Sequence, residues 1–143
     1  MRDGRADRTR APGAPETTHL SYSIDPAAPM VRLVYQGGPS FEEWERTMRA
    51  VLADPAYQRG FPFLVDRRFD EPTSRDTLRR VIHFLSLNEA ELAESRWAIV
   101  VSSLASYGMA RMKQGLGGDL PMPIQVFMDM GEAERWLRRD GAV

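Results

Sequence analysis

The sequence of 143 residues contains no cysteine, and this absence removes several kinds of chemistry at once. Without a thiol, the chain forms no disulfide, offers no thiolate to a metal ion and has no cysteine nucleophile. Histidine is scarce as well, since only His19 and His83 are present. Neither has a second ligand at the spacing that zinc sites use, so the sequence predicts no metal site and no cofactor.

The sequence also lacks a long apolar run and an excess of charge of either sign. No apolar stretch approaches the ~18 residues of a membrane span. The N-terminal arginines have no apolar stretch behind them, so we expect neither a secretory signal nor a transmembrane segment. The 19 basic and 20 acidic residues give a net charge of -1, which disfavours nucleic acid as a partner. The expected location is therefore cytoplasmic.

Residues 1–17 differ in composition from the rest of the chain. They are rich in Arg, Pro and Gly and contain no large apolar residue after Met1. Such a segment buries too little surface to offset the entropy of ordering it. We predict a disordered tail over residues 1–17, with a docking arm as the alternative, and a single domain over residues 18–143.

The first part of this domain has the pattern of a β-hairpin followed by a helix. Residues 20–24 alternate apolar and polar, residues 30–35 are rich in β-formers, and Asp25 with two prolines supplies a turn between them. Ser40 and Glu43 then have the spacing of a capping box, in which the serine accepts a backbone N–H and the carboxylate bonds back to the cap. The predicted helix ends near Asp54, because a proline follows it.

Strands and helices alternate in the remainder of the chain. We predict strands at residues 61–65, 96–101 and 123–127, and a loop at residues 67–72. The helices between and after them begin at Thr73 or Ser74, at Ser102 or Ser103, and at Asp129. The resulting order is β-β-α-β-α-β-α-β-α, which is typical of an α/β fold with a mixed, mainly parallel sheet of about five strands covered by helices.

Several short strings, in their order along the chain, resemble the STAS-like (SpoIIAA-like) family of small bacterial proteins. They are FEEW at 41–44, DPAY at 54–57, LVDRR at 64–68, WAIVV at 97–101, YGMAR at 107–111 and EAERWL at 132–137. The resemblance covers about residues 18–139 and implies a single-domain SpoIIAA-like fold, named after the sporulation anti-sigma factor antagonist. This branch of the family is largely uncharacterised.

The resemblance also has implications for function. Better-known STAS domains are not enzymes; they bind partner proteins and are switched by phosphorylation at the start of the helix after the third strand. The matching segment here, DEPTSRD at 70–76, places Thr73 and Ser74 at that position but lacks the motif's glycine. A related group of lipid-binding domains implies an apolar ligand cavity instead.

The residues themselves indicate two candidate binding groups. Asp66, Arg67 and Arg68 follow a buried strand, and ligands of open α/β sheets gather at the carboxyl ends of strands. An arginine there can hold a phosphate or carboxylate, although a structural ion pair explains the group equally. Tyr107 and Arg111 lie one helical turn apart, so they can join Arg67 in binding an anion or form an ordinary surface pair.

The sequence thus favours a non-enzymatic regulatory or protein-interaction module. Its partner would be another protein or a second copy of the chain, in a homodimer. The alternative is a small protein that binds an apolar ligand or a lipid, with Arg67, Arg68 and Arg111 as anchors for an anionic group. No catalytic residue is predicted, because no Gly-x-Ser-x-Gly elbow and no phosphate loop is present.

Overall fold

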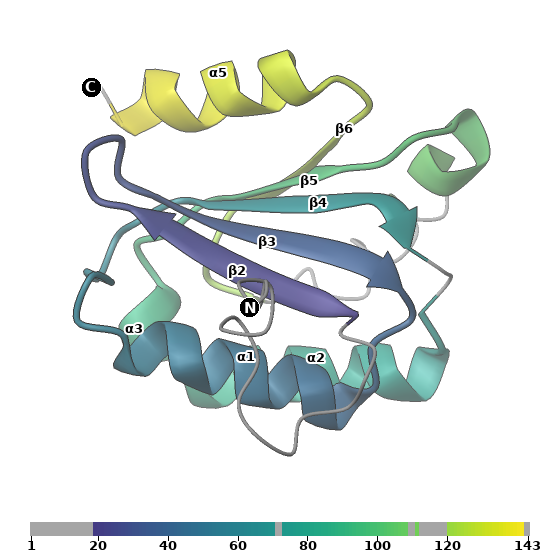
Figure 1. Ribbon diagram of the computed structural model, residues 1–143, viewed down its shortest axis with the longest axis horizontal. Helices are drawn as coiled ribbons and strands as arrows, with labels where there is room; N and C mark the ends of the chain where they lie inside the picture. The colour runs from purple at the N-terminus through teal and green to yellow at the C-terminus, as the bar shows by residue number, and fades with distance from the viewer. Residues whose placement is uncertain (1–18, 71–72, 109–110, 112–119, 142–143) are drawn as a thin grey trace, which may run out of the picture.

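The computed structural model describes residues 19–70, 73–108, 111 and 120–141. Figure 1 shows the two layers of helices with the sheet between them. The elements are β2 (Leu20–Asp25), β3 (Met30–Gly37), α1 (Phe41–Ala53), β4 (Phe63–Asp70), α2 (Arg75–Leu87), α3 (Glu89–Leu92), β5 (Trp97–Val100), β6 (Ile124–Phe127) and α5 (Met130–Gly141).

The five strands form one sheet in the order β2-β3-β4-β5-β6. β2 and β3 pair antiparallel, as the predicted hairpin requires, and all other pairs are parallel. At the turn between them, the Asp25 carboxylate accepts the N–H of Ala27 at 3.0 Å. The predicted α/β class and strand-helix order are confirmed, with residues 104–108 helical between β5 and β6.

Both faces of the sheet are covered by helices, as buried parallel strands require. α1, α2 and α3 cover one face, and α5 covers the other (Figure 1). The larger core lies under α1 to α3 and includes Leu33, Phe63 and Trp97. The smaller core, under α5, includes Leu64 and Leu137. Successive residues of β4 therefore point alternately into the two cores.

The capping serine of α1 acts as predicted, but its acidic partner does not. Ser40 accepts the backbone N–H of Glu43 at 3.1 Å, which makes it the N-cap of α1. The Glu43 carboxylate accepts the backbone N–H groups of His19 and Leu20, at 2.8 and 3.1 Å. The N–H groups at the start of the edge strand β2 need an acceptor more than the N–H groups of a solvated helix cap do. The Glu43 carboxylate therefore bonds to β2 and joins α1 to it.

The predicted loop at residues 67–72 is wrong for its first part, because β4 continues to Asp70. Val34 of β3 pairs with Asp66 of β4, and the next pair is Gln36 with Phe69. Between these two pairs, β3 moves on by two residues and β4 by three. β4 therefore carries one extra residue, a β-bulge, and then resumes its pairing with the end of β3. The bulge interrupts the apolar pattern, which is why the sequence reads as a loop there.

Other differences are small. The four-residue helix α3 was not predicted, since it is too short to show a helical period, although its Leu92 is fully buried. The predicted tail at residues 1–17 and the far end of the predicted helix at 104–113 lie outside the described residues. Within the described ranges, no helix is long and apolar enough to cross a membrane.

The core predicts a large difference between two leucine substitutions. Leu33 is fully buried on β3, so Leu33→Ala should lower the free energy of unfolding by about 2–5 kcal/mol. Leu87, which is 71% exposed on α2, is the matched control, and Leu87→Ala should change it by less than about 0.5 kcal/mol. Urea unfolding followed by circular dichroism measures both. Equal losses in the two variants would contradict the placement of β3.

Candidate functional site

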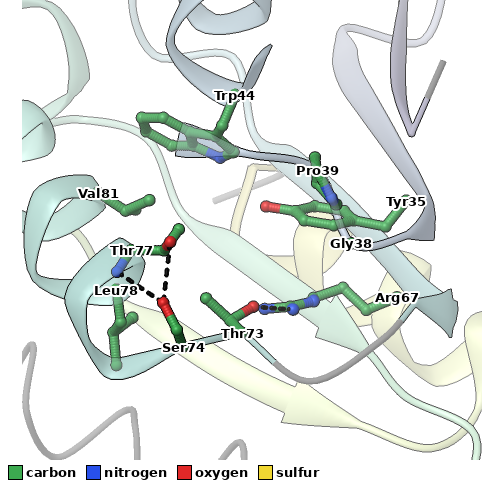
Figure 2. A pocket seen from close by; sticks show the side chains of 10 residues that line it. All are labelled: Tyr35, Gly38, Pro39, Trp44, Arg67, Thr73, Ser74, Thr77, Leu78 and Val81. Carbon is green, nitrogen blue, oxygen red and sulfur yellow. Dashed lines mark hydrogen bonds between the residues drawn. The ribbon is translucent and has the colours of Figure 1, made fainter. Parts of the chain in front are cut away.

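A pocket lies at the carboxyl ends of β3 and β4, where α1 and α2 begin. Its volume is about 250 Å³. Figure 2 shows the side chains around it. They are those of Tyr35, Gly38, Pro39, Trp44, Arg67, Thr73, Ser74, Thr77, Leu78 and Val81. This is the edge of an open α/β sheet at which ligands commonly bind.

Arg67 is the charged residue of the pocket wall, and three neighbours fix its position. Its Nε donates to Asp70 Oδ2 at 2.5 Å, and its Nη2 donates to Thr73 Oγ1 at 2.5 Å. Its guanidinium carbon lies 4.5 Å from the centre of the Tyr35 ring, at cation–π distance. The side chain is only 20% exposed, so the pocket holds a positive charge that water screens little.

Tyr35 is the most buried polar residue of the pocket, at 8% exposed. Burial raises the pKa of its hydroxyl, against the smaller opposing effects of the Arg67 charge and a hydrogen bond from Trp44. Tyr35 is therefore neutral at physiological pH and keeps its O–H proton. Figure 2 shows the hydroxyl pointing into the space between Trp44 and Thr73.

Thr73 and Ser74, which the sequence left as alternative helix caps, have different roles. Ser74 is the N-cap of α2, because its Oγ accepts the backbone N–H of Thr77 at 3.0 Å. The Ser74 hydroxyl also lies 3.0 Å from the Thr77 hydroxyl. Thr73 stands one residue earlier and accepts the hydrogen bond from Arg67.

Asp66 and Arg68 lie on the opposite face of the sheet from Arg67. Asp66 is 6% exposed, and Arg68 binds it through Nε at 2.9 Å and Nη2 at 2.9 Å. The hydrogen bond from Arg68, outweighing the effect of burial, lowers the pKa of the Asp66 carboxyl below its ordinary value. Since Leu64 and Asp66 are two residues apart on one strand, Asp66 points to the α5 side. The predicted group is thus split between the two faces of the sheet, with Arg67 on one face and Asp66 and Arg68 on the other.

Tyr107 and Arg111 share a helical face, as predicted. Arg111 Nη1 lies 3.2 Å from the Tyr107 hydroxyl, and its guanidinium carbon is 5.9 Å from the ring centre. Neither residue lines the pocket that contains Arg67. The nearby Ser103 acts as a cap, since its Oγ accepts the N–H of Ser106 at 3.0 Å. In the part of the chain that is described, no group of three or more metal-binding side chains occurs.

Comparison with known proteins establishes the fold. No protein-family model matches the sequence, and no curated protein matches it. The structure is similar to the 2.25 Å crystal structure of an uncharacterised protein of the DUF3478 family from Shewanella loihica PV-4, which has a SpoIIAA-like fold. The TM-score is 0.60 at 15% sequence identity, over 87% of this chain and 99% of that one. The protein is thus an α/β protein with a SpoIIAA-like fold, as the sequence resemblance implied.

Sequence reasoning missed the aromatic part of the pocket. The predicted strand at residues 30–35 includes Tyr35 correctly, and Trp44 is buried on α1, but the sequence did not indicate that the two line one pocket. The available signal was position, because Tyr35 is the last large residue before the Gly37-Gly38 turn and so lies at a carboxyl end of the sheet.

The Asp66–Arg68 pair predicts a pH-dependent effect on stability. The lowered pKa means that ionised Asp66 stabilises the fold above the ordinary aspartate pKa of about 3.9, and that this is lost as pH falls through the lower folded value. Asp66→Asn should therefore cost about 1–3 kcal/mol at pH 7. The difference from wild type should shrink as pH falls below about 4.

Urea unfolding at a series of pH values measures this difference. The control is Glu94→Gln, which alters an exposed carboxylate 3.9 Å from Arg59 and should cost less than about 0.5 kcal/mol at every pH. A cost of Asp66→Asn that stays constant from pH 7 down to pH 3 would show that the ionised carboxylate is not the stabilising species.

Proposed function

We propose that the protein is a non-enzymatic regulatory module that binds a partner protein around the start of α2 and is switched by phosphorylation of Thr73. The observation that supports this most directly is the hydrogen bond from Arg67 to the Thr73 hydroxyl at the edge of the pocket. A cation already in place at a hydroxyl is the arrangement that receives a phosphate.

The composition of the pocket supports a role without catalysis. Among the described residues that line it there is no histidine and no carboxylate. The two histidines lie elsewhere: His19 is beside Glu43, and His83 lies in a separate groove between α1 and α2.

The contacts of Arg67 indicate how a phosphate would act. A phosphate on Thr73 would be stabilised by Arg67 and by the N-terminus of α2, a helix of 13 residues. It would also compete with the Asp70 carboxylate for the same guanidinium. Phosphorylation would therefore redistribute charge over the end of β4, at the edge where α2 begins.

Two exposed apolar side chains occur at the same edge of the sheet. Phe69, on β4 two residues after Arg67, is 63% exposed, and Leu104, which follows β5, is 79% exposed. A partner protein, or a second copy of this chain, would cover such residues. A pocket of about 250 Å³ is small for a lipid, which favours the regulatory role over lipid binding.

The test is intact-mass and peptide mass spectrometry of the protein purified from its own source under several growth conditions. We expect a fraction with one added phosphoryl group, located on Thr73. Thr73→Ala should abolish it. Ser74→Ala, the matched control, should keep it while lowering stability by about 1 kcal/mol through loss of the helix cap.

Two results would contradict the proposal. One is a chain that carries no phosphate under any condition. The other is a phosphate confined to Ser74, because that hydroxyl bonds to Thr77 and not to Arg67.

A further inference from the structure

We propose that the pocket at the start of α2 binds a small organic monocarboxylate, held by the Tyr35 hydroxyl and the Arg67 guanidinium. This site does not depend on phosphorylation of Thr73, because both of its binding groups are present in the unmodified chain. It concerns a free small molecule and not the partner protein of the previous section.

The buried hydroxyl of Tyr35 is the first observation behind this proposal. Burial keeps the Tyr35 hydroxyl protonated, and the indole N–H of Trp44, which is only a donor, does not take up that proton. Tyr35 therefore still has its own proton to donate. Among the residues that the structure describes, no acceptor for this proton is found, although the side chain is only 8% exposed. A ligand oxygen in the pocket takes the place of water as this acceptor.

Arg67 is the second binding group. A guanidinium has five N–H donors, and the contacts of Arg67 with Asp70 and Thr73 engage its Nε and Nη2. Its Nη1 has no hydrogen-bond partner within the described part of the chain. The guanidinium stacks on the ring of Tyr35, so the two donors belong to neighbouring side chains at one wall of the pocket (Figure 2).

The charge and the donors of the pocket suit a monocarboxylate. Among the described residues that line the pocket, Arg67 is the one charged side chain, and Asp70 already shares it. The Ser74 hydroxyl is committed to the cap of α2 and to Thr77. The Tyr35 hydroxyl and the Nη1 group of Arg67 match the two oxygens and single charge of a carboxylate.

The rest of the pocket determines the body of the ligand. Leu78 and Val81 lie across the pocket from the two donors, and Pro39 and Trp44 add further apolar surface to the lining. The volume of about 250 Å³ is below the ~300–1,000 Å³ of pockets for drug-sized molecules. A single aromatic ring or a short branched chain, with one carboxylate, fits these dimensions.

The experiment is an NMR titration of the full chain labelled with nitrogen-15, using benzoate as the probe. We expect saturable shifts of the backbone amides of residues 73–78 and of the Trp44 indole N–H, with a dissociation constant on the order of 1 mM. Benzyl alcohol has the same ring without the charge, and inorganic phosphate has the charge without the ring. Both should bind at least about tenfold more weakly.

Matched variants identify the binding groups. Tyr35→Phe and Arg67→Gln should each weaken benzoate binding at least about tenfold. Arg80→Gln is the control, because Arg80 also stacks on an aromatic ring, 4.3 Å from the centre of Phe41, but lies outside this pocket. It should leave the affinity unchanged within about twofold.

Each contrary outcome overturns the proposal. These outcomes are the absence of saturable shifts, benzyl alcohol or phosphate binding as tightly as benzoate, and Arg67→Gln binding benzoate as well as wild type. If Tyr35→Phe fails to fold, the Arg67 variant and the two control ligands still decide the result.

Discussion

The central strand β4 packs against helices on both faces, and most of the other features follow from this two-sided burial. Phe63, Leu64 and Val65 are each no more than 3% exposed, so three consecutive residues lie in two different cores. A strand in this position needs helices above and below it and parallel neighbours on either side. The chain can then place polar groups only where β4 leaves the core. Arg67 stands at that point.

The candidate site arises from how the backbone groups at this edge are satisfied. Ser40 and Ser74 cap the two helices that begin there, which leaves room between their first turns. The bulge in β4 adds one residue, and Arg67 lies beneath the ring of Tyr35 at the end of β3. Capping, bulge and stacking together create a small pocket with the donors of Tyr35 and Arg67 next to each other at one wall.

The sequence predicts the order of the elements well, because the periods of strands and helices are local properties. For the same reason, it predicts Ser40 as the cap of α1 and limits the candidates for the cap of α2 to Thr73 and Ser74. The bulge after Asp66 could not be predicted, since it depends on the pairing of β4 with β3. The meeting of Tyr35 with Arg67, and the separation of Arg67 from Arg68, depend on that pairing as well.

Arg67 and Arg68 are consecutive, yet their side chains serve opposite faces of the sheet. The backbone N–H of Arg68 also donates to Asp66 Oδ1, at 3.1 Å, so any displacement of residue 67 by a bound molecule reaches the carboxylate on the other side. Free-energy coupling of this kind is reciprocal. A molecule that moves Arg67 would alter the acidity of Asp66, and protonation of Asp66 would alter the affinity for that molecule by the same factor. Two layers that share no side chain would thus be coupled through a single peptide unit.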